Sequence, residues 1–342
     1  MVKMAKKDVA KKLEDYELTR PDQLTMFELA GLEDKKYSHT IELYDFIPKY
    51  FWGKVERINN QFLPLLEREF SCRGINYKVS IAPARIKDKD GTVKDYYPSQ
   101  REELVEDALR KLASEGQSLF LDDQAGVTFT LYQLQKELES MGHCYSYAQI
   151  KEALSICVRT NIEIKTEDGS NVIDSHIFDT VGLRTLDDWM GHEKKTKAFV
   201  RFNPLVTSSI KNRSFRQLNY EKSMSYKSVV ARQLHKRMSH HYTQASVMNT
   251  YQIMLSTMIR DFGLTAYQRL KDNLRDAKIA LEEMKEKDVL LDYKIERTID
   301  PNLHNKLLDA KFLLSPHPKF CSEIIKANNR QRQIDAPEFE TQ

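Results

Sequence analysis

Three histidines come nearest, in type and spacing, to a reactive site. His235, His240 and His241 stand together in the stretch HKRMSHH, and histidine is a common ligand of transition metals. On a helix, however, His235 and His240 are five residues apart and lie on different faces, and the lysine and arginine between them repel a cation. We therefore expect no metal ligands among these histidines.

Other catalytic patterns are absent from the sequence. It contains no G-x-x-x-x-G-K-[ST] loop to hold ATP and no H-E-x-x-H pair to hold zinc. A rolling-circle nickase needs two histidines flanking an apolar residue, and the chain lacks that triplet although its 16 tyrosines offer many nucleophiles. The pairs Glu102-Glu103 and Glu282-Glu283 fall on predicted helices and are typical of solvated faces. We expect no catalytic residues, no cofactor and no enzymatic activity.

A local excess of positive charge is more informative. The stretch Leu205–Gln244 contains eight basic residues and one acid, Glu221, for a net charge of +7, whereas the whole chain has +3. Tyr220, Tyr226 and Tyr242 lie among them, a combination typical of a surface that follows a phosphate backbone. A solvated helix face with a linker would give the same charge, so the charge alone does not decide. The basic residues of this cationic stripe are Lys211, Arg213, Arg216, Lys222, Lys227, Arg232, Lys236 and Arg237.

The composition is that of an ordinary globular protein. Hydrophobic residues make up 41% and charged residues 30% of 342 residues, a length that suggests about two domains. The four cysteines form no CxxC pair, which fits reduced thiols better than disulfides or a zinc site. No apolar run approaches the roughly 18 residues of a membrane helix, and the N-terminus lacks the features of a signal peptide. We expect a cytoplasmic protein without membrane contact.

The elements that would position a binding site form two similar units. In the first, helices follow one another across a tight turn at Gly142 and lead into a hairpin that turns at Asp168-Gly169. This succession is typical of a winged helix, whose second turn-flanking helix reads DNA. The predicted elements are a hairpin at 77–97, a helix at 99–116, a strand at 118–122, helices at 130–142 and 146–160, a hairpin at 162–178 and a strand at 197–206.

The second unit repeats that order. Its third helix has an inward stripe at helical spacing, Ala266, Leu270, Leu274, Ala277 and Leu281. A strand pair follows, and its turn near Pro301-Asn302 would make a wing. The predicted elements are helices at 226–244, 251–263 and 264–288, strands at 289–300 and 306–318, and a closing helix at 318–330.

Polar side chains on the two predicted reading helices can reach base edges or phosphates from the major groove. Ordinary α+β lobes with polar helix faces are the alternative interpretation. The candidate DNA-binding residues are Ser146, Tyr147, Gln149 and Lys151 in the first unit, Thr265, Gln268, Arg269, Lys271 and Arg275 in the second, and Lys211, Arg213, Arg216, Lys227, Arg232, Lys236 and Arg237 in the cationic stripe.

The order of elements, the aromatic lead-in LYDFIPKYFWG and the basic helix YKSVVARQLHKRMSHHYTQ resemble bacterial plasmid replication initiators. These are the Rep/RepA proteins, which bind repeated origin sequences called iterons, and the resemblance covers about Leu43 to Asn328. It implies two winged-helix domains on double-stranded DNA, the second making the main base contacts and the first also serving self-dimerisation. It further implies opening of the origin and recruitment of host replication proteins. The reading helices would map to Thr265–Arg275 and Ser146–Lys151.

We therefore predict an α+β protein made of two tandem winged-helix domains preceded by a flexible N-terminal arm. A transcriptional repressor with the same fold and a DNA-nicking rolling-circle Rep are the alternatives. The predicted divisions are an arm at 1–40, winged-helix domains at 41–212 and 213–330, and a C-terminal tail at 331–342.

A knot of apolar residues in the polar arm suggests a further partner. The peptide Gln23-Leu24-Thr25-Met26-Phe27 is similar to the Q-L-[SD]-L-F peptide that partners of the bacterial sliding clamp carry on flexible arms. The glutamine amide would satisfy polar groups at the pocket rim, while Leu24, Met26 and Phe27 would fill an apolar pocket. The alternative is a first helical turn capped by Asp22, with Leu24 and Phe27 packed on the body.

Overall fold

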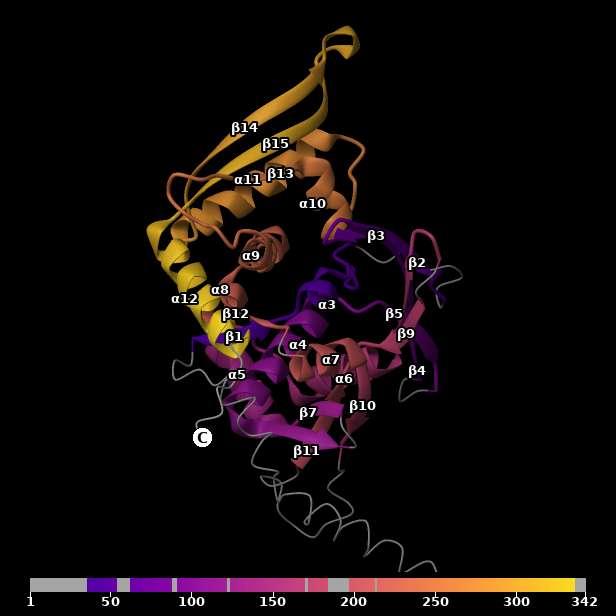
Figure 1. Ribbon diagram of the computed structural model, residues 1–342. Coiled ribbons are helices and arrows are strands. Elements are labelled where there is room, and N and C mark those ends of the chain that lie inside the picture. The colour runs from indigo at the N-terminus through magenta and orange to yellow at the C-terminus, as the bar shows by residue number, and fades with distance from the viewer. Residues whose placement is uncertain are drawn as a thin grey trace, which may run out of the picture.

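The computed structural model describes residues 36–53, 62–87, 91–121, 124–169, 172–183, 197–212 and 214–335, and Figure 1 gives their arrangement. Most of the predicted arm and the end of the predicted tail lie outside the described residues. The described part corrects two boundaries. Residues Tyr37–Thr40, assigned to the arm, form strand β1, and the last helix, α12, continues to Asp335, inside the predicted tail.

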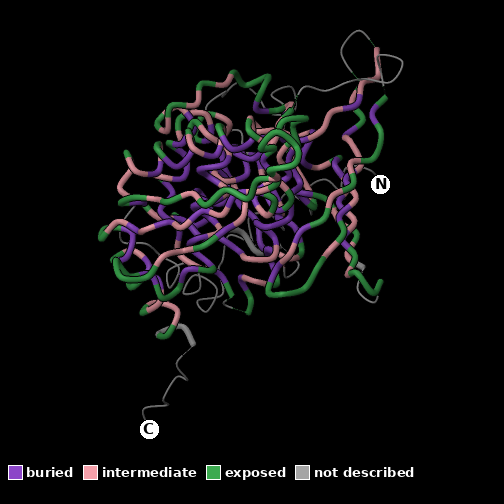
Figure 2. Tube along the Cα trace, turned by 90° about the horizontal axis from the view of Figure 1, so that it is seen from above, coloured by how far each residue is buried: buried purple, intermediate pink, exposed green. Residues whose placement is uncertain are grey.

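Two hydrophobic cores divide the chain into what we call the first and second lobes. One core runs from Ile41 to Met224 and the other from Tyr226 to Ile324. The boundary therefore falls at about residue 225, not at 212. Helix α7 (Pro204–Lys211), strand β12 (Arg216–Asn219) and helix α8 (Tyr220–Ser225) belong to the first lobe. Buried residues lie mainly inside the molecule (Figure 2).

Several first-lobe elements lie where the sequence predicted them. The Asp168-Gly169 turn joins β8 (Asn161–Thr166) to β9 (Val172–His176). The first-lobe helices are α3 (Glu42–Phe46), α4 (Gln100–Leu112, with a short π-helical extension, Ala113–Gln117), α5 (Leu131–Ser140) and α6 (Tyr147–Arg159). The remaining strands are β2 (Leu66–Cys72), β3 (Ile75–Ala82), β4 (Ala84–Lys87), β5 (Val93–Tyr96), β6 (Ser118–Leu121), β7 (Gln124–Thr130), β10 (Phe178–Gly182) and β11 (Lys197–Phe202).

Most of the first-lobe strands form two four-stranded sheets. Their strand orders are β10-β11-β7-β6 and β2-β3-β8-β9, and all their pairings are antiparallel. The predicted hairpin at 77–97 is in fact divided. Its first half is β3, which pairs with β2 and β8, and only β4 and β5 pair across the turn at Gly91. Val79 and Ile81 of β3 are buried in the core.

The second lobe departs from prediction at two places, at residues 251–263 and at the start of helix α11, which begins at Leu270 instead of at residue 264. Residues 251–263 were expected to form one helix, but Tyr251–Met254 form strand β13 and only Leu255–Asp261 form helix α10. Ile253 lies opposite Phe312 in the sheet, so burial against a distant strand outweighs the local helical pattern. The other elements are α9 (Val229–His241), α11 (Leu270–Glu286), β14 (Leu290–Asp300), β15 (Lys306–Pro316) and α12 (Pro318–Asp335), with strand order β13-β15-β14.

Buried histidines are a feature of this fold that responds to pH. Burial lowers the pKa of His39, His235 and His240 to about 3. His235 lies edge-on to aromatic rings, and Nε2 of His240 is 3.2 Å from the Thr40 hydroxyl. An unfolded chain would bind protons on these side chains below about pH 6.5, whereas the folded chain does not.

We predict that stability falls as the pH drops from 7.5 to 5, because protonation of the three histidines favours the unfolded chain. Burial raises the pKa of two carboxyls, Asp107 and Glu137, so their protonation favours the folded chain as the pH drops. Two such carboxyls are outnumbered by the three histidines. Thermal melts at pH 7.5, 6 and 5 would measure it, and His235→Phe should flatten the profile. Equal melting temperatures at pH 7.5 and 5 would contradict the prediction.

Candidate nucleic-acid interface

The second lobe contains a helix–turn–helix whose turn is closely defined. Helix α10 ends at Asp261, and Gly263 takes the left-handed conformation with φ +61°. The amide of Gly263 donates to the carbonyl of Arg260 at 3.2 Å, and the amide of Leu264 donates to that of Ile259 at 3.0 Å. These bonds satisfy the last carbonyls of α10 and turn the chain sharply toward α11.

A buried asparagine holds the segment before α11. The Asn273 side chain accepts a bond from the amide of Tyr267 at 3.0 Å and donates to the carbonyl of Thr265 at 2.8 Å. Thr265, Gln268 and Arg269 are exposed as predicted, but they precede α11, so the prediction that they lie on the helix was wrong. Sequence reasoning missed Asn273, because its position on the inward side of α11 gives no sign of its backbone partners.

Helix α11 presents its basic residues outward. Lys271 and Arg275 are exposed, whereas Leu274, Ala277 and Leu281 are buried as the predicted stripe required. Ala266, placed in that stripe by prediction, is exposed because it lies before the helix begins. Arg275 pairs with Asp272 at 3.2 Å and with Asp276 at 3.6 Å, so its guanidinium is partly neutralised on its own helix.

The hairpin of β14 and β15 projects from the body beside α11 (Figure 1). Its tip is the short 3-10 turn Pro301–Leu303, near the predicted turn residues. Lys294, Arg297 and Lys306 are exposed on this hairpin and are further candidates for phosphate contacts. Nothing in the sequence indicated these candidates, because acids alternate with them along the strands and the stretch has no net positive charge.

The first lobe holds a second helix–turn–helix in α5 and α6. Thr130 begins α5, and the Ser146 hydroxyl accepts from the amide of Gln149 at 3.3 Å, while the Gln149 side chain accepts from the amide of Ser146 at 2.9 Å. Both predicted contact residues therefore cap α6. Tyr147 and Lys151 are exposed on the first turns of the same helix.

An aromatic residue and a lysine of α5 were not predicted as contacts, although they lie in the same unit. Tyr132 is 56% exposed, and the Lys136 ammonium lies 5.7 Å from the centre of its ring. Both belong to the helix that precedes the turn, which sequence reasoning treated only as support for α6.

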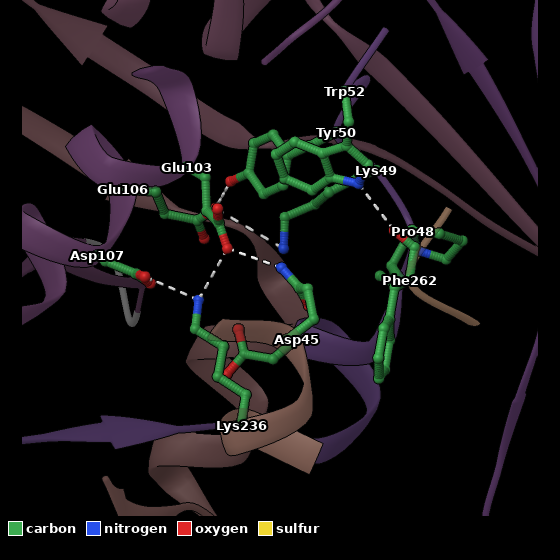
Figure 3. Close-up of a pocket in the computed structure, with 12 residues that line it drawn as sticks. Asp45, Pro48, Lys49, Tyr50, Trp52, Glu103, Glu106, Asp107, Lys236 and Phe262 are labelled. Carbon is green, nitrogen blue, oxygen red and sulfur yellow. Dashed lines mark hydrogen bonds and ion pairs between the residues drawn. The ribbon is translucent and has the colours of Figure 1, made fainter. Parts of the chain in front are cut away.

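The cationic stripe does not form a phosphate surface along α9. Arg232 is fully buried, and its Nε donates to Glu103 of α4 at 2.9 Å. Lys236 is 5% exposed and pairs with Glu103 at 3.3 Å and with Asp107 at 2.7 Å. The prediction that Arg232 and Lys236 contact DNA was therefore wrong, because both side chains are enclosed between the lobes. Figure 3 shows Lys236 beside Glu103 and Asp107.

The other stripe residues differ in their surroundings. Arg237 is largely buried and donates to Asp261 at 2.9 Å, while Arg216 is half-buried and donates to the Asn328 side chain at 2.5 Å. These two are also engaged inside the protein. Lys211, at the end of α7, and Lys227, before α9, are exposed. Arg213 lies outside the described residues.

Opposite charges determine the ionisation of the pairs between α4 and α9. Burial alone would raise the pKa of Glu103, but Arg232 and Lys236 outweigh burial and lower it. Burial alone would lower the pKa of Lys236, but Asp107 and Glu103 outweigh burial and raise it. Glu103 and Lys236 therefore keep their charges at neutral pH. The acid Glu103, predicted to lie on a solvated face, is 1% exposed.

The remaining predicted sites have plainer outcomes. The clamp-like residues Gln23, Leu24, Met26 and Phe27 lie outside the described residues. Within the described ranges, no group of three or more His, Cys, Asp or Glu side chains is arranged to hold a metal ion. In that same part of the chain, no helix has the length and apolar character needed to cross a membrane.

Comparisons with known proteins gave matches only among solved structures. No family model matches the chain, and no curated protein matches it. The crystal structure of RctB domains 2-3 matches with TM-score 0.47 and 10% identity, over 83% of this chain and 99% of that one. A selenomethionine crystal structure of RctB domains 2 and 3 matches with TM-score 0.44 and 11% identity, over 74% and 91%.

The third structural neighbour is an initiator. The crystal structure of the Pi initiator protein in complex with iteron DNA matches with TM-score 0.43 and 14% identity, over 64% of this chain and 91% of that one.

The burial of Lys236 predicts an effect on stability. Lys236→Ala leaves Glu103 and Asp107 with one cation fewer in an enclosed site, so it should lower the free energy of unfolding by about 3–5 kcal/mol. Lys227→Ala is the matched control and should change it by less than about 0.5 kcal/mol, because that lysine is exposed. Urea unfolding of both variants measures the difference. Equal stabilities would place Lys236 in solvent.

Proposed function

We propose that this chain is a sequence-specific double-stranded DNA-binding protein that initiates replication at repeated origin sequences. The observation that carries the proposal is the organisation of the second lobe. Helix α9, strand β13, helices α10 and α11, and strands β14 and β15 follow in that order, and β13 pairs with β15. This order and pairing support a winged helix, in which α11 would be the reading helix and the β14–β15 hairpin the wing.

The exposed chemistry of that lobe suits a duplex. Three polar side chains of the helix–turn–helix can donate hydrogen bonds to base edges or to phosphate oxygens. They are Lys271 and Arg275 on α11 and Gln268 before it. The projecting hairpin adds Lys294 and Arg297, which can reach a neighbouring backbone. A reading helix in the major groove with basic groups beside it on the backbone is the usual arrangement of such a unit.

The first lobe supports the proposal as a second, modified copy. Helices α5 and α6 and the hairpin of β8 and β9 follow the same order, with Tyr147 and Lys151 exposed on α6. The strand before α5, β7, pairs with β11 and β6 instead of with the hairpin. We propose that this lobe makes accessory contacts and also serves self-association.

An initiator fits better than the two alternatives. A transcriptional repressor of this fold has no use for a sliding-clamp peptide, which the arm of this chain resembles. A nicking enzyme would need two histidines flanking an apolar residue, a triplet that the sequence lacks. We therefore propose a protein that acts without catalysis and without a cofactor, and that recruits the clamp and other host replication proteins to an opened origin.

The DNA contacts are testable with single substitutions. Gln268→Ala and Arg275→Ala should each weaken binding to the cognate repeat by about 1–3 kcal/mol if each side chain contacts a base. Lys326→Ala, an exposed lysine of α12 outside the helix–turn–helix, is the control and should bind as the wild type does. The probe is a duplex that the wild-type chain selects from a random-sequence pool, measured by fluorescence anisotropy beside an unselected duplex.

Two outcomes would count against these base contacts. An equal loss on selected and unselected duplexes would make Gln268 and Arg275 phosphate contacts. A wild-type chain that selects no sequence from the pool would overturn the proposed function itself.

The clamp peptide is testable in the same chain. Leu24→Ala combined with Phe27→Ala should abolish binding to the bacterial sliding clamp and leave DNA affinity unchanged. Two buried anchors of this size account for roughly 3–6 kcal/mol, most of the about 8 kcal/mol of a micromolar peptide. A pull-down and a thermal melt of the double variant decide. Retained clamp binding would contradict the proposed clamp peptide. A melting temperature lowered by several degrees would instead indicate that these residues pack on the fold.

A further inference from the structure

We propose that Trp52 and Arg68 of the first lobe are positioning residues for the helix–turn–helix of the second lobe. By holding the turn between α10 and α11, they determine the spacing between the DNA segments that the two lobes read. This inference rests on the proposed function. Neither residue is a predicted DNA contact. Both would affect DNA binding only through the position of α11.

The first contact is made by Trp52. After α3 the chain runs from Pro48 to Gly53 along the α10–α11 turn, and the indole Nε1 of Trp52 donates to the carbonyl of Phe262 at 2.8 Å (Figure 3). Phe262 is the C-cap of α10, so its carbonyl is one of those that the helix leaves without an internal partner. An indole N–H has a single direction, and this bond therefore fixes both the distance and the angle of the turn.

The second contact is made by Arg68 of β2. Its Nη1 donates to the carbonyls of Pro48 and Tyr50, at 2.5 and 2.6 Å, which braces the Pro48–Gly53 segment. The same guanidinium lies against Gly263. A Cβ on that glycine would come within 2.5 Å of Nη1 and 3.0 Å of the Pro48 ring. Only glycine allows this approach, and its φ of +61° is also one that other residues rarely adopt.

The third contact comes from the backbone of β2. Asp261, the last residue of α10, is 4% exposed and accepts a bond from the amide of Ser71 at 3.3 Å. It also accepts from Arg237 of α9 at 2.9 Å, which ties the turn to the body of its own lobe. Three consecutive residues, 261 to 263, are therefore each touched by a different group of the first lobe.

These contacts set the geometry between the reading helices. Helix α11 follows the turn directly, and α6 belongs to the lobe from which Trp52, Arg68 and Ser71 reach across. Each added base pair moves a site along the duplex and rotates it about the axis, so a protein with fixed reading helices accepts one spacing. If the turn were released, α11 could follow its site, and the preference for one spacing would weaken.

The test measures spacing preference in the full-length chain. The probes are the selected duplex and versions with one or two base pairs inserted or removed between the two segments that footprinting protects. The wild type should lose at least about tenfold in affinity for the altered spacings. Trp52→Phe keeps the apolar ring and removes only the donor, and it should shrink that ratio by at least about threefold while binding the native spacing a few-fold more weakly. Arg68→Lys should act in the same direction.

The control and the contrary outcomes separate this inference from the proposed function. Tyr97→Phe removes one hydrogen bond within the first lobe, to the carbonyl of Pro64, and should leave the spacing ratio unchanged. An unchanged ratio in both Trp52→Phe and Arg68→Lys, an equal loss of affinity at every spacing, or a wild type indifferent to spacing would overturn the inference. Each of these results leaves selective DNA binding, and hence the proposed function, standing.

Discussion

The arrangement of the two lobes depends on one buried carboxylate, Glu103 of α4. It accepts hydrogen bonds from Arg232, Gln233 and Lys236, all on α9 of the second lobe. A carboxylate that is 1% exposed is tolerable only when cations and donors surround it, because removal from water penalises the charged form strongly. Glu103 therefore requires α9, and the lobes cannot separate without exposing or unpairing this charge.

A second group of buried polar contacts holds α3 against α4. Asp45 accepts from Arg110 of α4 at 2.5 and 3.1 Å and from the Ile41 amide at 2.7 Å, and Tyr50 donates to Glu106. Burial alone would raise the pKa of Asp45, but Arg110 outweighs burial and lowers it. Any other packing of these elements would bury a charge without a partner, so the polar contacts select one orientation more sharply than apolar contacts do.

What could be predicted from the sequence is what depends on near neighbours in the chain. Helices α5 and α6 begin where expected because Thr130 and Ser146 cap them through residues three positions later. Strand β13 was missed because its partner lies near residue 312, too distant for a local pattern to reveal. The burial of Arg232 was missed for the same reason, since Glu103 is 129 residues away. A count of charges reports how many cations a stretch carries, not which side chains face another lobe.

The use of these cations inside the protein changes how it would hold DNA. With Arg232, Lys236 and Arg237 bound to carboxylates, these three cations of the stripe are not available to phosphates, and few exposed basic groups lie on each proposed reading helix. Non-specific attraction, which grows with the number of neutralised phosphates, is then weak for either lobe alone. Two weakly binding units gain affinity when they are joined so that both sites are engaged at once, and they lose it when the geometry forbids this. The contacts at Glu103 and at the α10–α11 turn would then decide affinity as well as spacing, because they place both units on one duplex.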